Sequence, residues 1–105
     1  MNYKEKYLYF TNGGGSTDPL NWSRGEMALY PVSMFKGVRP HSGSAIDLFF
    51  EGGSKVRLTI KNGFHAKITL AIANAIANSA SGVIAIADVD SNLFIDRNIL
   101  AVEIF

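Results

Sequence analysis

Basic side chains are the residues of this chain whose types and spacing favour a particular chemistry. Residues 36–67 contain six Lys or Arg against two acidic residues, whereas residues 82–105 contain one Arg against four. Lys and Arg bind nucleic-acid phosphates, and neighbouring aromatic rings can stack on bases. The sequence therefore indicates four candidate nucleic-acid-binding residues: Lys36, Arg39, Arg57 and Lys61.

The same pattern has a second interpretation. Lys and Arg on the outer face of a sheet also keep a protein in solution or contact another subunit. The aromatic residues Phe35, Phe49 and Phe64 could stack on bases or belong to the core. Because the net charge is only +1, no global field attracts nucleic acid, so any binding depends on the local basic surface.

Other motifs do not predict catalysis or metal binding. The segment Gly13–Thr17 lacks the Gly-Lys-Ser/Thr ending of a phosphate-binding loop. The segment 88–99 opens like a calcium loop, but it has Leu93 where glycine and Ile99 where glutamate would stand. There are two histidines and no cysteine. We therefore predict no catalytic residue, no metal site, no cofactor and no enzymatic activity.

Hydrophobic periodicity predicts a mainly β domain with one amphipathic helix before the last two strands. The strand at 55–61 alternates with a basic outer face, and residues 64–81 have helical spacing, followed by Gly82 at the C′ position. Pro31 indicates an edge or bulge. The predicted elements are a strand at 7–10, a glycine loop at 12–16, a helical turn at 20–22, an extended segment at 27–38, a loop at 39–43, strands at 45–51 and 55–61 joined by Gly52-Gly53, a helix at 64–81, and strands at 83–89 and 99–105.

The two C-terminal strands are apolar on both faces, although the whole chain is only 48% hydrophobic. A strand of this kind needs cover on both sides, and a second copy of the chain would supply it. We predict a subunit interface formed by Val83, Ile84, Ile86, Ile99, Leu100, Val102, Ile104 and Phe105. No segment predicts a signal peptide or a membrane span, so we expect one domain, 1–105, in the cytoplasm and no membrane partner.

The chain resembles a family of small ocean-metagenome proteins of probable cyanophage origin that adopt an Sm-like barrel. Tyr7–Asn12 and the stretch 71–81 carry the resemblance. The segment Ile95–Ile99 stands where Sm proteins have their second motif, with Arg97 and Asn98 shifted by one position and the glycine absent. The resemblance implies a strongly bent antiparallel sheet, a ring joined through the last two strands, and nucleic-acid binding, with Arg97 and Asn98 as further candidates.

Two functions follow from these patterns. The first is a homo-oligomeric ring of about five to seven subunits that binds RNA or single-stranded nucleic acid through a basic face. The alternative is a phage structural or assembly protein that binds no ligand, in which the apolar strands serve assembly alone. If the protein is phage-encoded, both functions place it in the cytoplasm of the host cell.

Overall fold

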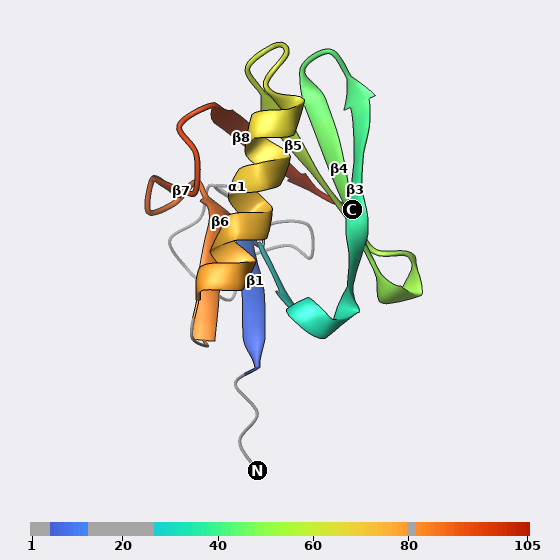
Figure 1. Cartoon of the computed structure of the whole chain (residues 1–105), viewed down its shortest axis with the longest axis vertical. Helices are drawn as coiled ribbons and strands as arrows, with labels where there is room; N and C mark the ends of the chain where they lie inside the picture. The colour runs from blue at the N-terminus through green and yellow to red at the C-terminus, as the bar shows by residue number, and fades with distance from the viewer. Residues whose placement is uncertain (1–4, 13–26, 80–81) are drawn as a thin grey trace.

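Two four-stranded sheets and one helix form the described part of the chain, residues 5–12, 27–79 and 82–105, in a computed structural model (Figure 1). Sheet A has the strand order β2-β1-β6-β7, and sheet B has the order β3-β4-β5-β8. The elements are β1 Lys6–Thr11, β2 Met27–Pro31, a 3₁₀ turn Val32–Met34, β3 Phe35–Ser42, β4 Ala45–Phe50, a second 3₁₀ turn Glu51–Gly53, β5 Lys55–Ile60, α1 His65–Asn78, β6 Gly82–Asp88, β7 Leu93–Phe94 and β8 Ile99–Ile104.

The prediction of a mainly β fold with one helix before the last strands is confirmed. The prediction of antiparallel pairing throughout is wrong for β1 and β6, which pair in parallel. Parallel strands need a long crossover, and here most of the chain lies between the two. Because the described strands form two separate ladders, they do not close into a barrel.

The break between the sheets lies at Pro31. The sequence predicts one extended segment over 27–38, but this segment divides into β2 in sheet A and β3 in sheet B. Proline has no N–H to continue a ladder, and the 3₁₀ turn that follows it redirects the chain. The predicted loop 39–43 is also mostly strand, because β3 continues to Ser42. The predicted loop 12–16 and helical turn 20–22 lie largely or wholly outside the described residues.

The core lies between the sheets and α1. Side chains alternate along β5 as predicted: Val56, Leu58 and Ile60 are buried. Phe50 on β4 joins the two sheets, because its ring stacks on Tyr30 of β2 at 4.1 Å and meets Phe10 of β1 edge-on at 6.2 Å. The turn after Phe50 needs the predicted glycines, since Gly52 and Gly53 have φ values of +82° and +86°.

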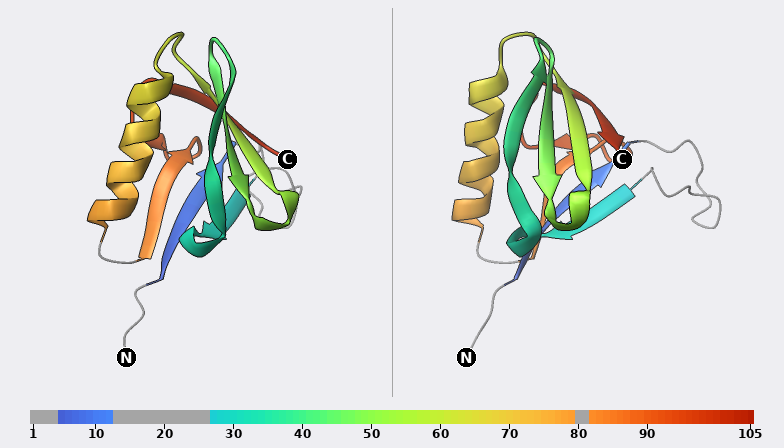
Figure 2. Two further views of the ribbon diagram at one scale, coloured as in Figure 1. Left: turned by 45° about the vertical axis from the view of Figure 1, so that its right-hand side comes forward. Right: turned by 90° about the vertical axis from the view of Figure 1, so that its right-hand side faces the viewer.

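Helix α1 stands along one side of the molecule, next to β6 (Figure 2). It buries Ile68 and Ile72, which belong to the predicted apolar face. The helix ends earlier than predicted, at Asn78, because Ser79 is already extended. Gly82 is therefore the first residue of β6 rather than the C′ residue, with φ at +92°. Among the described residues, no helix has the length and apolar character needed to cross a bilayer.

Candidate nucleic-acid interface

The outer face of sheet B carries a row of charged residues that lie directly opposite one another. Arg39 of β3 pairs with Asp47 of β4, which pairs with Arg57 of β5, which pairs with Glu103 of β8. Since side chains alternate along a strand, all four share the face that points away from the core. Sequence alternation predicts this basic face on β5, and the strand pairing extends it across the sheet.

Asp47 is the fixed centre of this row. Its carboxylate accepts hydrogen bonds from Arg57 Nε at 2.7 Å and Nη2 at 3.1 Å, and Lys55 Nζ lies 3.9 Å away. The residue is only 5% exposed because longer side chains cover it. The hydrogen bond from Arg57 lowers the pKa of Asp47 and raises the pKa of the guanidinium. Arg57 is thus held in one orientation, with one of the two charges on this pair offset by the other.

Aromatic rings lie beside the cations on the same face. The ring of Phe105 lies under Lys55 Nζ at 4.5 Å and the Arg57 guanidinium at 5.1 Å, measured to the ring centroid. The Arg39 guanidinium is 5.9 Å from the centroid of Phe49, at the outer limit of a cation–π contact. Cations and rings in this arrangement match surfaces that bind a phosphate backbone and stack its bases.

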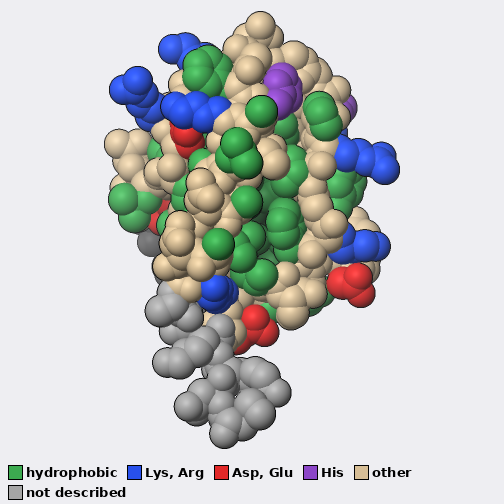
Figure 3. Space-filling model, viewed as in Figure 1, with side chains coloured by type: hydrophobic (Ala, Val, Ile, Leu, Met, Phe, Trp, Pro, Cys, Tyr) green, Lys and Arg blue, Asp and Glu red, His purple; other side chains and the backbone are tan. Residues whose placement is uncertain are grey.

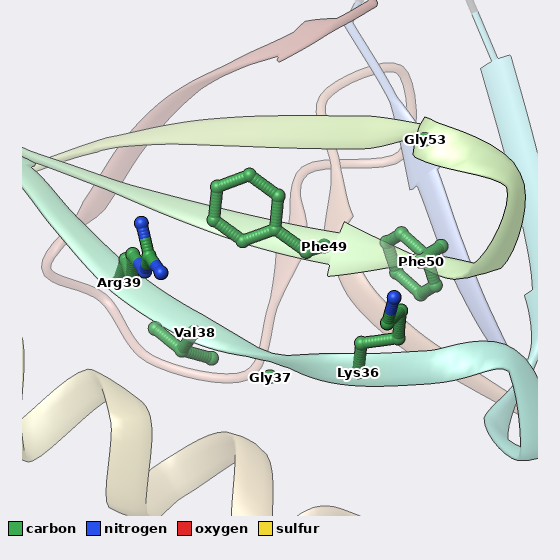
Figure 4. A pocket seen from close by; sticks show the side chains of 7 residues that line it. All are labelled: Lys36, Gly37, Val38, Arg39, Phe49, Phe50 and Gly53. Carbon is green, nitrogen blue, oxygen red and sulfur yellow. The ribbon is translucent and has the colours of Figure 1, made fainter.

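A hollow of about 410 Å³ opens beside Phe49 (Figure 4). Lys36 and Arg39 reach from β3 toward β4 on either side of the ring, and the bare backbone of Gly37 lies between them. A bulge shifts the strand register between Phe35 and Gly37, which turns Lys36 toward the hollow. A Cβ at Gly37 would meet no atom within 4 Å, so its absence leaves the hollow open. The remaining lining residues are Val38, Phe50 and Gly53.

Lys36 and Arg39 are the cations of this face that are free to bind. Within the described ranges, neither side chain has an ion pair or a hydrogen bond, unlike Arg57. Lys and Arg side chains project along the β3 side of the molecule (Figure 3). Of the six candidates named from sequence, Lys36, Arg39 and Arg57 are brought together here.

The other three candidates lie elsewhere. Lys61 follows β5 and its side chain is exposed, while its backbone N–H bonds to the carbonyl of Asn98. Asn98 is 6% exposed, and its backbone N–H and side-chain Nδ2 both donate to Asp96 Oδ1, at 2.8 and 2.7 Å. These bonds lower the pKa of Asp96. The Asn98 side chain therefore closes a turn and is not presented to a ligand.

Arg97 lines a second hollow of about 570 Å³ at the other end of the C-terminal segment. Its remaining walls are Val89, Asn92, Phe94, Ile99 and Leu100. Sequence reasoning placed Arg97 with the basic stretch because charge was the only visible signal. None of its lining residues is shared with the hollow beside Phe49.

Lys55 and Phe105 belong to this face although they were not named as nucleic-acid-binding candidates. Lys55 had a visible signal, since it alternates with Arg57 along the same strand. The place of Phe105 depends on the pairing of β8 with β5, which brings it to Lys55. The two histidines serve other contacts: His65 Nε2 is 2.6 Å from the Ser42 carbonyl, and His41 Nδ1 is 3.8 Å from Asp47. Among the described residues, no three His, Cys, Asp or Glu side chains lie close enough to hold a metal ion.

The predicted subunit interface divides into buried and exposed residues. Four of its members are at most 9% exposed and pack in the core of their own chain, so they are unavailable to a neighbour: Ile84, Ile86, Ile99 and Val102. The second copy that the sequence seemed to require is unnecessary for them, because α1 and the facing sheet cover them. Ile104 is partly buried, whereas Val83, Leu100 and Phe105 are between 53% and 61% exposed.

Comparison of the chain with protein-family models, with curated proteins and with solved structures finds no match. The resemblance to Sm-like proteins therefore stays a prediction. The argument for function rests on the geometry of the outer face of sheet B.

Replacing Asp47 with asparagine lowers thermal stability in a pH-dependent way. Folding lowers the pKa of Asp47, so its stabilising effect is complete above about pH 5 and is lost as the pH falls toward 3. We expect Asp47→Asn to lower Tm by about 5 °C at pH 6, with the difference from wild type shrinking on acidification. Thermal unfolding followed by circular dichroism between pH 6 and pH 3 measures this.

Glu51→Gln is the matched control, because Glu51 is exposed and has no ion pair within the described residues. This control should unfold at the wild-type temperature near neutral pH. A difference between Asp47→Asn and wild type that stays constant down to pH 3 would contradict the role given to the Asp47–Arg57 pair.

Proposed function

We propose that the protein binds single-stranded nucleic acid on the outer face of sheet B, as a subunit of a homo-oligomeric Sm-like ring in the cytoplasm. The observation that carries the proposal is the placement of four cations and two rings on this face. The cations are Lys36, Arg39, Lys55 and Arg57, and the rings are Phe49 and Phe105.

Charge on this face supports an anionic ligand. Asp47 and Glu103 are the carboxylates of the cross-strand row, and Asp47 is already engaged by Arg57. The cations therefore exceed the carboxylates, and the two unpaired cations lie at one edge. A strand of phosphates releases its counterions when it meets such a surface, so binding should weaken as salt rises.

Exposed rings favour a single strand over a duplex. In a duplex, the faces of the bases are stacked on one another and are closed to side chains, whereas in a single strand they can stack on aromatic residues. Phe49 is partly exposed and Phe105 is 53% exposed, so both are open on the solvent side. RNA and single-stranded DNA share the chemistry that these groups recognise.

Binding to a fluorescein-labelled strand of ten uridines, followed by anisotropy at several salt concentrations, tests the proposal. About three phosphate contacts would give a slope of log K against log salt near −2. A deoxyuridine strand separates RNA preference from general single-strand binding, and a duplex of the same length should bind more weakly. An absence of binding at about 50 mM salt would refute the proposed function.

The ring is the second part of the proposal. Strands β3 and β8 are the two edges of sheet B within the described residues, so each has one unpaired side. Joining β8 of one subunit to β3 of the next would continue the sheet head to tail, which closes into a ring when the rotation permits. Exposed Leu100 and Phe105 lie on or directly after β8 and would be covered by the neighbour.

Light scattering coupled to size-exclusion chromatography tests the ring. We expect a mass of about five to seven subunits, and a change of Leu100 to glutamate should shift the protein toward the monomer by placing a charge in the interface. A wild-type protein that elutes as a monomer at high concentration would contradict the ring and leave the strand-binding face to be tested by itself.

A second candidate function is a phage structural or assembly protein without a ligand. Exposed apolar residues favour it, since Val83, Leu93 and Leu100 are each more than half exposed. It predicts stable oligomers with no affinity for any nucleic acid. The anisotropy titration and the light-scattering measurement together distinguish the two functions.

A further inference from the structure

The hollow beside Phe49 has the dimensions and the walls of a small-molecule site. Its volume of about 410 Å³ lies toward the lower end of the range for ligand pockets, about 300–1,000 Å³. One wall is an aromatic ring, and two unpaired cations stand on the opposite strand. The side chains of Lys36 and Arg39 lie on either side of Gly37, where no side chain divides the space between them.

The three groups differ from the rest of the face in being unoccupied. Arg57 and Lys55 are engaged by Asp47 and Phe105, so they supply charge without offering an open ring. At 5.9 Å, the Arg39 guanidinium is loosely placed over Phe49 and can turn toward an anion without losing a strong contact. An aromatic ring beside two available cations is suited to a ligand that has both a flat ring and an anionic group.

We infer that this hollow binds one nucleotide unit, with its base stacked on Phe49 and its phosphate between Lys36 and Arg39. The inference rests on the proposed function and names the subsite at which the strand is held most tightly. A base without a phosphate would leave the two cations unused, and a phosphate without a base would leave the ring uncovered. The hollow therefore selects nucleotides over plain polyanions.

A tryptophan placed at position 49 reports stacking directly, because a base in contact with an indole quenches its fluorescence. The protein carries Phe49→Trp together with Trp22→Phe, so that the indole at position 49 gives the signal. The control carries Leu70→Trp with Trp22→Phe, since Leu70 is 62% exposed on α1. The probes are a strand of ten uridines, uridine monophosphate, ribose phosphate and inorganic polyphosphate.

We expect the strand to quench the tryptophan at position 49 over the same concentrations at which anisotropy detects binding. Uridine monophosphate should quench it at higher concentration, while ribose phosphate, polyphosphate and the Leu70→Trp control should give no quenching. Independently, Phe49→Leu should weaken strand binding about tenfold, as expected for the loss of one stacked base, and leave polyphosphate binding unchanged.

Strand binding without quenching at position 49, and with no effect of Phe49→Leu, would overturn this inference and leave the proposed function standing. Equal loss of strand and polyphosphate affinity in Phe49→Leu would also overturn it, because it would assign Phe49 to the shape of the surface. An absence of strand binding together with an absence of quenching by uridine monophosphate would refute both. Circular dichroism of each variant establishes that it is folded.

Discussion

Replacing Lys36 and Arg39 together with glutamine lowers the affinity for a ten-nucleotide single strand about 100-fold at low salt. Each change removes a cation that has no ion-pair partner within the described residues, so its charge is available to a phosphate. A hydrogen bond to a charged group contributes about 1.5 kcal/mol at the low end, and two such losses amount to about two powers of ten. The salt slope should become shallower by about 1.4.

The matched control is Lys61→Gln with Arg97→Gln. It removes the same total charge, and both residues are exposed outside the hollow beside Phe49. Anisotropy titrations of the two double variants at several salt concentrations separate local contact from net charge. If both double variants lose affinity equally, binding follows the overall charge of the protein and the assignment of the site to β3 and β4 is wrong.

Replacing Phe50 with alanine lowers the free energy of unfolding by about 3–5 kcal/mol, a large fraction of the stability of a domain of this size. Phe50 is 1% exposed and contacts Phe10, Tyr30 and Phe35, with ring centroids 4.1 to 6.2 Å apart. These partners belong to both sheets, so the cavity left behind would lie where sheet A meets sheet B. Urea unfolding monitored by far-ultraviolet circular dichroism measures the loss.

Phe49→Ala is the control for this change, because it removes the same ring from the next residue of the same strand. Phe49 points to the outer face and is partly exposed, so we expect its removal to cost about 1 kcal/mol or less. The two neighbours should therefore have opposite effects: Phe50→Ala on stability, and Phe49→Ala on strand binding. Similar destabilisation by both would contradict the assignment of Phe50 as the link between the sheets.

This pair of neighbours has a general consequence for the face. The side chain that positions the ligand and the side chain that holds the sheets together alternate along one strand, with Asp47 and Leu48 as the preceding pair. Changes to the outer face can therefore be made without opening the core. The same separation means that Arg39 and Lys36 can be exchanged with little effect on folding, which makes their role in binding directly measurable.

The sequence by itself determined the local features of this protein. Alternation in 55–61 predicted both the buried face of β5 and its basic outer face, and period-3.6 spacing predicted α1 with Ile68 and Ile72 inward. Gly52-Gly53 predicted the hairpin turn, which has positive φ at both positions. These features depend on neighbours in the chain, so composition and spacing carry the information.

Only the tertiary structure decided which distant residues meet. The parallel pairing of β1 with β6, the passage of the chain between sheets at Pro31, and the burial of Ile84 and Ile86 within one chain have no local signature. The hollow also depends on such contacts, since a bulge at Gly37 and the pairing of β3 with β4 bring Lys36 and Arg39 to Phe49. Strand pairing depends on contacts between segments far apart in the chain, and one residue of register decides which face each side chain occupies.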